Sequence, residues 1–227
     1  MMASGVIAGR LRSGNGRIYG FMAATDYALH AVVLPFLPRL RALAPGIRVA
    51  VEAVESNRSQ AQAQAQVRFE RGELDLALIT PETTPADLHA HHLFDETYVC
   101  AVRTGHPDGG TETISLDRFC ELDHVLVPLS GQRFRGVTDI ALATIGRQRH
   151  VVLSVTSFLI LSEVLKTTDL IAVIPSRLVK DNSELSLIVT PVSIPGFSKI
   201  AVWHDRTHRD LVHQWVRSLL FGSADNA

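Results

Sequence analysis

Apolar and polar positions follow two different periods along the chain, and together they predict an α/β protein. Ile18–Ala24 is an apolar run of strand length, and Thr25-Asp26 after it offers an N-cap to a helix. Apolar residues then recur about every 3.6 positions until Pro45-Gly46. This stripe consists of Leu29, Val33, Phe36, Leu37, Leu40 and Leu43. Pro35 and Pro38 are expected to kink the helix or to delay its start.

The alternation of strands and helices continues to residue 79. Residues 47–53 alternate between apolar and polar or small side chains, which is typical of a strand with one solvated face. The segment 59–71 is rich in Ala and Gln and predicts a helix that stops at Gly72. Leu74–Ile79 is a nearly continuous apolar run, typical of a strand that is covered on both faces. This order predicts right-handed crossovers and a parallel sheet.

A second round of the same alternation follows. Its predicted elements are a strand at 98–102, a short helix after Ser115, a strand at 125–127, a helix at 137–145, a strand at 151–155, a helix at 158–165 and a strand at 170–174. The chain ends with a strand at 200–203 and a helix at about 210–221. The inner stripe of this last helix is expected to contain Leu211, Trp215, Val216, Leu219 and Leu220. Two α/β units are therefore expected.

Composition narrows the class of protein. The chain has 227 residues, of which 46% are hydrophobic and 20% charged, enough for one large globular domain or two small ones. Lys and Arg number 22 against 23 Asp and Glu, so the overall charge attracts neither nucleic acid nor an anionic membrane. No apolar run approaches the ~20 residues of a membrane-spanning helix. Residues 1–16 lack the pattern of a signal peptide and are expected to form a loose tail, which predicts a cytoplasmic protein.

Known catalytic and metal-binding motifs give no support for an enzyme. The chain has no GxSxG, HExxH, GxxxxGK[ST] or SxxK motif. Gly14-Asn15-Gly16 precedes a strand, whereas a dinucleotide fingerprint follows one. Two histidine clusters are interpreted as surface or capping residues rather than metal ligands. They are His89, His91 and His92, and His204, His208 and His213. Cys100 and Cys120 do not form a CxxC motif and are interpreted as free core thiols in a reducing compartment.

Small polar residues recur where predicted strands end and helices begin. They are Thr25-Asp26, Thr80, Ser130-Gly131 and Thr156-Ser157. Each one alone could be an ordinary N-cap or turn residue. In open α/β sheets, however, ligands bind at the carboxyl ends of the strands, where helix N-termini present free N–H groups. Four such positions together favour a ligand-binding cleft between the two units.

Two ordered sets of residues resemble the effector-binding domain of LysR-type transcriptional regulators. The first set is Asp26-Tyr27, Val33-Leu34-Pro35, Leu43–Gly46 and Gly72–Leu78. The second set is Leu93–Cys100, Gly105-His106-Pro107, Thr168–Ala172, Ile174-Pro175, Trp203-His204, Arg209-Asp210 and His213–Arg217. The second set is similar to the subgroup that responds to aromatic or nodulation-type inducers. The resemblance runs from about Arg17 to Phe221 and rests on the ordered set as a whole.

The resemblance implies two Rossmann-like subdomains joined by two crossover strands, the architecture of type 2 periplasmic binding proteins. Subdomain I would comprise residues 17–95 and 196–227, and subdomain II residues 96–195. It implies no catalysis, no cofactor and no metal. A small aromatic or organic-acid effector would bind in the cleft and shift a conformational equilibrium. By position, its ligand-binding residues would be Thr25, Leu29, Thr80, Pro81, Ser130, Gly131, Thr156, Ser157, Phe158, Ile174 and Val202. Ser157 stands where the aromatic-responsive subgroup often has His, so the identity of the inducer does not transfer.

The resemblance also sets expectations about partners. The family's winged helix-turn-helix is not found in this sequence, so DNA would be contacted only through that additional domain. The family dimer is antiparallel, with the helix from Leu29 to Ala44 packing on the partner's helix from Phe158, and this surface would cover Val32 or Leu40. No membrane partner is expected. The main alternative is a solute-binding protein for a small organic ligand, which shares the fold. An enzyme on this fold would need an acid and a base at the cleft, for which only Asp26 is a candidate.

Overall fold

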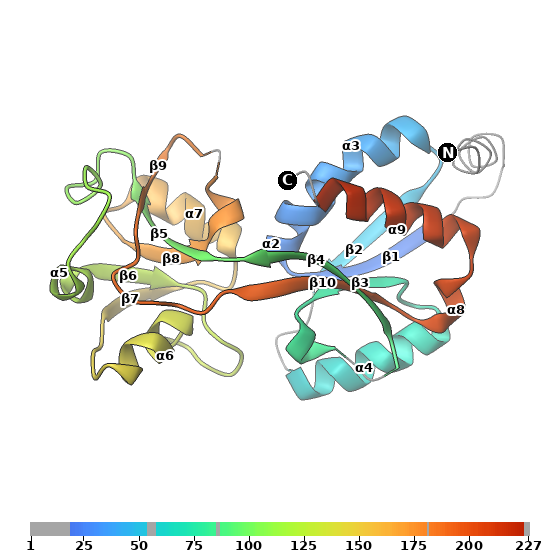
Figure 1. Ribbon diagram of the computed structural model, residues 1–227, viewed down its shortest axis with the longest axis horizontal. Coiled ribbons are helices and arrows are strands. Elements are labelled where there is room, and N and C mark those ends of the chain that lie inside the picture. Colours follow the sequence, from blue (N-terminus) through green and yellow to red (C-terminus); the bar gives the residue numbers. More distant parts are fainter. Residues whose placement is uncertain (1–18, 54–57, 85–86, 181, 225–227) are drawn as a thin grey trace. The chain divides into compact units, whose positions relative to one another are not determined.

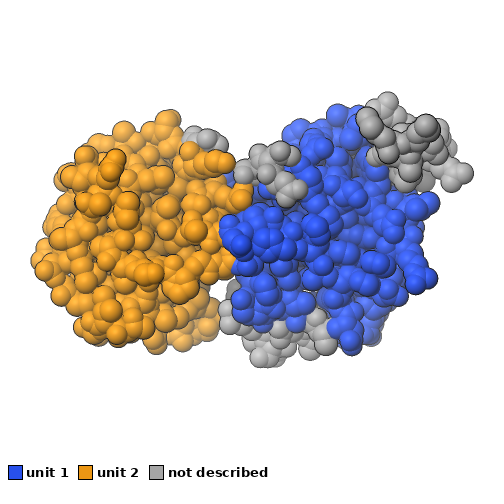
Figure 2. All heavy atoms as spheres, in the orientation of Figure 1, with its two compact units in different colours: residues 1–95, 198–227 blue, residues 96–197 orange. Residues whose placement is uncertain are grey.

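The computed structural model describes residues 19–53, 58–84, 87–180 and 182–224, and the chain divides into two compact units. Unit 1 comprises residues 1–95 and 198–227, and unit 2 comprises residues 96–197 (Figure 1, Figure 2). The chain therefore passes from one unit to the other twice. Strands β4 (His89–Glu96) and β10 (Phe197–Trp203) carry the two passages.

Unit 1 is built on a five-stranded sheet in the order β2-β1-β3-β10-β4. Its remaining strands are β1 (Tyr19–Ala24), β2 (Arg48–Ala53) and β3 (Leu76–Ile79). β1 runs parallel to β2 and to β3, as the alternation of strands and helices predicts. The parallel arrangement predicted for these first three strands is therefore confirmed, whereas β10, which that prediction did not include, is antiparallel to β3. The reason is topological, because β10 arrives from unit 2 and enters the sheet at the carboxyl end of β3, where Ile200 pairs with Ile79.

Helices cover both faces of this sheet (Figure 1). After β1, α2 (Asp26–Ala28), a π-helical turn (Leu29–Val33) and α3 (Leu34–Leu43) form one continuous helical run. Pro35 and Pro38 lack the N–H that an α-helix needs at those positions, and the wider turn lies directly before them. This run packs against α9 (Leu211–Ala224), while α4 (Arg58–Arg71) covers the opposite face. The short helices of unit 1 are η2 (Pro81–Thr83) and α8 (Asp205–His208).

The hydrophobic core of unit 1 has one layer on each side of the sheet. On the α4 side, Phe69 is fully buried in a cluster that includes Val202. On the other side, Val32 and Leu40 are 0% and 1% exposed, so the expectation that a partner would have to cover them is wrong. Leu211 was expected on the inner stripe of α9, but it is the first residue of that helix and is 62% exposed. The chain's own helices therefore cover the hydrophobic core of unit 1.

Unit 2 contains two small sheets that a bridge brings together. One sheet has the order β8-β5-β9, formed by β8 (Ala172–Pro175), β5 (Tyr98–Arg103) and β9 (Leu185–Ile188), with both neighbours antiparallel to β5. The other is the parallel pair β6 (Asp123–Leu126) and β7 (His150–Ser154). A parallel bridge between His124 and Ile171 places β6 beside the start of β8. The carboxyl ends of β6, β7 and β8 therefore lie at the same edge.

Short helices surround these strands. They are α5 (Leu116–Glu121), α6 (Val137–Thr144), α7 (Phe158–Thr167) and η3 (Ser176–Leu178). The cluster that they enclose includes Cys100 from β5, Phe119 from α5 and Leu142 from α6, each of them 0% exposed. α5 begins after its N-cap Ser115, as the sequence predicts. Unit 2 therefore has a core of its own.

Two segments of unit 2 meet where the chain enters and leaves it. The carboxylate of Glu96, which is 2% exposed, accepts hydrogen bonds from the amide of Thr97 at 2.8 Å and from the amide and hydroxyl of Ser176 at 3.1 and 2.6 Å. Gly196 lies directly against the backbone of the same residue. A Cβ added at Gly196 would be 2.1 Å from the carbonyl oxygen of Glu96. No side chain fits in that space, so glycine is what allows the two segments to approach.

Candidate functional site

The candidate residues of unit 1 lie at the carboxyl edge of its sheet. Thr25 follows β1 and Thr80 follows β3, and these two strands are parallel neighbours. Thr25 is exposed, and its Oγ1 accepts a hydrogen bond from the amide of Ala28 at 3.2 Å, which makes it the N-cap of α2. Thr80 is half-buried and is the N-cap of η2. Leu29 and Pro81 stand in the turns that follow, half-buried and exposed respectively.

The candidate residues of unit 2 gather in the same way. Ser130-Gly131 follows β6 and Thr156 follows β7, and these strands are a parallel pair. Ser130, Gly131 and Thr156 are exposed, and Gly131 has a φ of +77°, a conformation that favours glycine. Ser157 is the N-cap of α7, since its Oγ accepts a hydrogen bond from the amide of Ile160 at 3.2 Å. Half-buried Phe158 is the first residue of that helix.

Two candidates lie within the hydrophobic core. Val202 is 0% exposed and belongs to the cluster around Phe69, and Ile174 is 0% exposed in β8. The polar candidates of each unit thus share an edge, whereas these two lie beneath the surface. A role of any candidate in ligand binding stays a prediction.

Lys199 is a residue at the unit 1 edge that the sequence analysis did not identify. It precedes Ile200, which pairs with Ile79, so it stands beside Thr80 at the start of β10. Its side chain is buried, with Lys199 3% exposed, and its Nζ lies 5.6 Å from the centroid of the Tyr27 ring. Burial lowers the pKa of Lys199 to about 8, and the nearby Glu82 carboxylate opposes part of that effect. The sequence signal that could have identified Lys199 is the presence of a lysine within the apolar run of β10.

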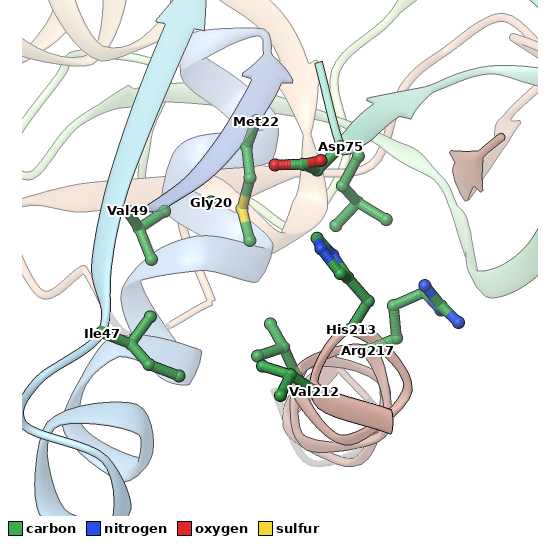
Figure 3. Close-up of a pocket in the computed structure, with 10 residues that line it drawn as sticks. Gly20, Met22, Ile47, Val49, Asp75, Val212, His213 and Arg217 are labelled. Atoms are coloured by element: carbon green, nitrogen blue, oxygen red, sulfur yellow. The ribbon is translucent and has the colours of Figure 1, made fainter. Parts of the chain in front are cut away.

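A hollow of about 460 Å³, which includes space open to solvent, lies elsewhere in unit 1. Figure 3 shows Met22 and Val49 of the sheet facing Val212 of α9. Gly20 and Asp75, at or just before the amino ends of β1 and β3, also line it. The hollow is therefore mainly apolar and lies toward the opposite edge of the sheet from Thr25 and Thr80.

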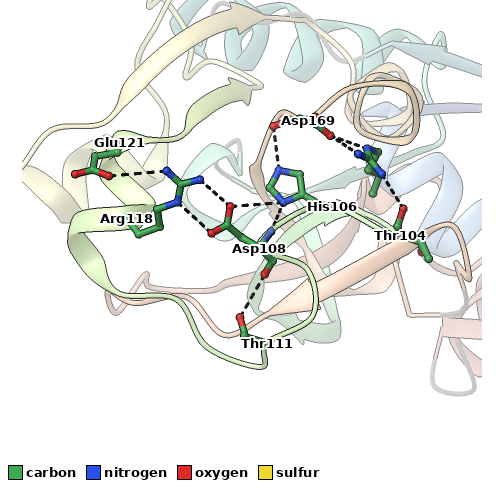
Figure 4. Close-up of polar contacts among 8 residues, drawn as sticks. Thr104, His106, Asp108, Thr111, Arg118, Glu121 and Asp169 are labelled. Atoms are coloured by element: carbon green, nitrogen blue, oxygen red, sulfur yellow. Dashed lines mark hydrogen bonds and ion pairs between the residues drawn. The ribbon is translucent and has the colours of Figure 1, made fainter.

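Polar side chains of unit 2 form a network that fixes the loop after β5 (Figure 4). The buried ring of His106 accepts a hydrogen bond at Nδ1 from the amide of Asp108 at 3.0 Å and donates from Nε2 to the carbonyl of Asp169 at 3.1 Å. Arg118 binds the Asp108 carboxylate through two hydrogen bonds of 3.0 Å. Arg103 pairs with the Asp169 carboxylate. Because every group in this network is engaged in holding loops together, we assign it a structural role.

A second polar cluster of unit 2 is buried. The Arg149 side chain is 1% exposed and binds the Asp139 carboxylate through two hydrogen bonds of 2.8 Å. Its Nη1 also lies 3.2 Å from Nδ1 of His124, which is 0% exposed. Burial together with the charge of Arg149 lowers the pKa of His124 to about 4. Burial is the largest single effect on the pKa of Asp139 and would raise it, but the hydrogen bonds from Arg149 and from the amide of Gly136, together with the charge of Arg149, lower the pKa overall.

The two histidine clusters identified in the sequence are in contact through one residue of each, His89 and His208. The His89 and His208 rings stack with centroids 3.8 Å apart, and Nε1 of Trp203 donates a hydrogen bond to Nδ1 of His208 at 3.2 Å. Nε2 of His89 lies 3.0 Å from the Asp205 carboxylate. His204 is the N-cap of α8, in agreement with its interpretation as a capping residue. Among the residues that the structure describes, no group of three His, Cys, Asp or Glu side chains is arranged to hold a metal ion.

The two cysteines differ in their surroundings. Cys100 is a buried free thiol whose pKa burial raises to about 12, as expected for a core residue. Cys120 is half-buried and free, and the Arg147 guanidinium lies beside it, a neighbour that the local sequence does not show. Within the described part of the chain, no helix is long and apolar enough to cross a membrane.

These observations define a class of protein. Two α/β units, each with its own core and a polar carboxyl edge, are joined by two crossover strands. This is the architecture of type 2 periplasmic binding proteins, in which the fold serves to bind a small molecule.

The chain belongs to a particular family of this class, the LysR substrate binding domain, whose pattern matches residues 21–224. It is 28% identical over 223 residues to the HTH-type transcriptional regulator SyrM 1 of Sinorhizobium fredii, covering 97% of this chain and 63% of that protein. It is 32% identical over 156 residues to the HTH-type transcriptional activator NahR of Pseudomonas putida, covering 67% of this chain and 51% of that protein. The chain thus spans roughly half to two thirds of the length of these relatives.

Solved structures agree on the fold. The regulatory domain of MexT, a transcriptional activator in Pseudomonas aeruginosa, superposes with a TM-score of 0.73 at 23% identity, covering 92% of this chain and all of that one. The similar proteins are transcriptional regulators and not enzymes. They favour a regulatory domain over a solute-binding protein.

Proposed function

We propose that this domain binds a small organic effector and that binding controls transcription by a longer regulator of which the domain is the sensing part. The match to the LysR substrate binding domain across residues 21–224 is the observation that carries the proposal. In such a protein the DNA would be contacted through a separate DNA-binding domain, which agrees with the net charge of −1 in this sequence. The regulator would act in the cytoplasm, where its DNA is.

The polar candidates at the two carboxyl edges are the proposed effector contacts. Thr25 and Thr80 offer hydroxyls in unit 1, and Ser130 and Thr156 offer hydroxyls in unit 2. Helix N-termini at both edges add N–H donors, and Phe158 adds an aromatic ring. This combination suits an aromatic acid or a phenol, since such a ligand has one flat apolar face and one or two acceptors.

We also propose that the chain forms a homodimer. Leu34 and Leu43 on α3 are 49% and 40% exposed, and Ile160 on α7 is 55% exposed. A partner copy that packs α7 against α3 would cover these side chains in both subunits of an antiparallel dimer. β2 next to α3 is an edge strand of its sheet, so its outer side is also available for this contact. Sedimentation of the wild type and of Leu43→Lys tests the dimer, because the charged variant should sediment as a monomer.

A thermal-shift screen of the purified chain tests effector binding. Aromatic acids, phenols, flavonoids and amino acids form the panel, since a ligand that binds only the folded state raises the melting temperature. A hit is then measured by calorimetry on Ser157→Leu, which places a bulky apolar side chain at the unit 2 edge. We expect this variant to lose binding while its far-UV circular dichroism stays that of the wild type.

Ser115→Leu is the matched control for that experiment. Ser115 is also an N-cap, because its Oγ accepts a hydrogen bond from the amide of Arg118 at 3.2 Å, but it follows a loop and not a strand. It should therefore lose as much helix capping as Ser157→Leu and keep full affinity. Unchanged affinity in Ser157→Leu would remove the proposed site from this edge.

A further inference from the structure

Gly20 leaves a gap in the face of the unit 1 sheet that packs on α9. Gly20 and Met22 are two residues apart on β1, so their side-chain directions share one face. Gly20 pairs with Val49 on β2, and Met22 pairs with Leu76 on β3. All four residues line the hollow beside α9. A Cβ added at Gly20 would meet no heavy atom of the described residues within 4 Å, apart from its chain neighbours, so the hollow is open where this glycine lacks a side chain.

The hollow has an apolar floor and an open rim. Met22, Ile47 and Leu76 are each 3% exposed and form the floor. Val212 and Val216 of α9 are half-buried, so they bound the hollow where it reaches solvent. Small-molecule sites typically have a mainly apolar lining with a few polar groups at fixed positions. A glycine within a strand often marks a place where a ligand approaches closely.

Two polar groups lie at one end of the hollow, the Asp75 carboxylate and the His213 ring. In Figure 3 the His213 ring extends from α9 toward the sheet, on the side where Asp75 lies. The Asp75 carboxylate is held in place by the amide of Phe21 at 3.1 Å and by the Arg206 guanidinium at 3.2 Å. The His213 ring is half-buried and makes no hydrogen bond to another described residue. A carboxylate only accepts and a neutral imidazole has one acceptor nitrogen, so this end fits a ligand O–H or N–H donor.

The charges around the hollow disfavour an acid as its ligand. The Arg217 guanidinium donates to the carbonyls of Thr207 and His208 at 3.2 and 3.0 Å. It also lies 4.6 Å from the centroid of the Trp203 ring, so it is engaged away from the hollow. A ligand carboxylate would bring a second negative charge beside Asp75 and would place that charge among apolar side chains. A neutral ligand with one donor avoids both costs.

We propose that this hollow is a second ligand site, which binds a neutral aromatic molecule of one or two rings with a single O–H or N–H donor, such as a phenol or an indole. The ring would lie over Gly20 between the sheet and α9, and its donor would face His213 and Asp75. The size is suitable, because an apolar cavity of roughly 150 Å³ can hold benzene. The hollow has about 460 Å³ of empty space, including the part open to solvent. This inference goes beyond the proposed function, whose effector contacts lie at the carboxyl edges.

Two pairs of compounds isolate the donor, p-cresol beside anisole and indole beside benzofuran. The members of each pair have nearly the same size, and only the first carries an O–H or N–H group. Thermal shift and titration calorimetry measure their binding to the 227-residue chain at pH 8, where free imidazole is neutral. We expect p-cresol or indole to bind about tenfold more tightly than its donor-free partner.

Gly20→Ile tests the location of the site. Its backbone is that of an ordinary strand residue, so an isoleucine is tolerated there and fills the hollow from β1. Affinity for the bound compound should fall at least about tenfold, while the melting temperature without ligand stays equal or rises. Gly110→Ile is the matched control, because Gly110 also has open space for a Cβ but lies in unit 2. If Gly20→Ile does not fold, Val216→Phe narrows the hollow from α9 and should cause the same loss.

His213→Leu tests the polar end of the hollow. It removes the acceptor nitrogen and keeps an apolar side chain, so p-cresol or indole should lose most of its advantage over the donor-free partner. The affinity for that partner should stay within about twofold of the wild type. His213→Gln keeps an acceptor and should retain part of the advantage. A side chain that only supports α9 would instead change the affinities of both members of a pair equally.

The outcomes distinguish this site from the proposed effector site. Equal affinity for donor and donor-free compounds, or no binding of any of the four to a cooperatively unfolding chain, would overturn the second site and leave the proposed function standing. Ser157→Leu should bind p-cresol or indole with full affinity. Loss of binding in Ser157→Leu with full affinity in Gly20→Ile would place the compound at the unit 2 edge, which supports the proposed function and overturns the second site.

Discussion

Acidification from pH 7 to pH 5 is expected to destabilise unit 2 through His124. The ring is fully buried, its Nε2 lies 2.7 Å from the carbonyl oxygen of Phe119, and its Nδ1 lies 3.2 Å from the Arg149 guanidinium. A carbonyl only accepts and a guanidinium only donates, so the hydrogen-bond network assigns the proton to Nε2 and leaves Nδ1 as the acceptor. A second proton on Nδ1 would point at a positive charge. The neutral ring is therefore the form that fits.

The magnitude follows from the two pKa values. Burial and the charge of Arg149 lower the pKa of His124 from 6.5 to about 4 in the folded chain. Below pH 6.5 the unfolded chain binds this proton and the folded chain does not, so the stability contributed by the neutral ring is fully present above pH 6.5 and is lost as the pH falls toward 4. Proton linkage with these values gives a loss of about 2 kcal/mol between pH 7 and pH 5.

Urea unfolding at the two pH values measures this loss. Trp203 and Trp215 are the chain's two tryptophans and both belong to unit 1, so their fluorescence follows unit 1 while far-UV circular dichroism follows both units. The chain has nine other histidines, so the wild type is compared with His124→Gln, which keeps a donor and an acceptor but does not ionise. The unfolding free energy of the variant should change by about 2 kcal/mol less between pH 7 and pH 5.

His150→Gln is the control for that comparison. His150 is also in unit 2, but its side chain is 69% exposed and pairs with Asp123 at the surface. Its variant should keep the pH dependence of the wild type. If His124→Gln loses as much stability on acidification as the wild type does, the ring is not held neutral, and the assignment of its two hydrogen bonds is wrong.

Three further substitutions test other parts of the structure by urea unfolding. Arg149→Met leaves the Asp139 carboxylate without its buried partner and should cost about 3–5 kcal/mol, while a loss below about 1 kcal/mol would contradict a buried pair. Gly196→Ala brings a Cβ within 2.1 Å of the Glu96 carbonyl, so it should cost about 1–3 kcal/mol or more, and a neutral effect would contradict this close approach. Ser157→Ala removes the N-cap of α7 and should cost about 1 kcal/mol, which Ser157→Asp should largely restore.

Local periodicity was sufficient for the parallel part of the fold. The apolar runs of β1 and β3 and the helical stripe between β1 and β2 each lie within a short window, so the sequence predicts them directly. β9 and α8 were not predicted, because Ser186 interrupts the short apolar run of β9 and the four residues of α8 include no apolar side chain. The antiparallel pairings of β10 with β3 and of β5 with β9 join segments far apart in the chain. Nothing in the local pattern specifies such a pairing.

The difference between local signals and long-range pairing also explains which residues of the candidate site the sequence could identify. Thr25 and Ser157 were identified because a cap residue after a strand is a local signal. Lys199 was missed because its place beside Thr80 depends on β10 being the neighbour of β3, which is a matter of sheet order. His89 and His208 were assigned to separate clusters for a similar reason, although their rings stack. Long-range pairing therefore decides which of the locally visible residues come together.

Thr25 and Ser157 each combine a structural and a proposed binding role, and the geometry shows how the two can be separated. Each side chain accepts one hydrogen bond from a helix amide, which a hydroxyl can do while it donates its own proton to another acceptor. Thr25→Asp and Ser157→Asp keep the cap, since a carboxylate is a good N-cap acceptor, but they remove the hydroxyl donor and add a negative charge. Stability should therefore stay close to that of the wild type while the affinity for an anionic effector falls. The alanine variants lose the cap as well, so the difference between the two series measures the part of each residue's role that belongs to the ligand.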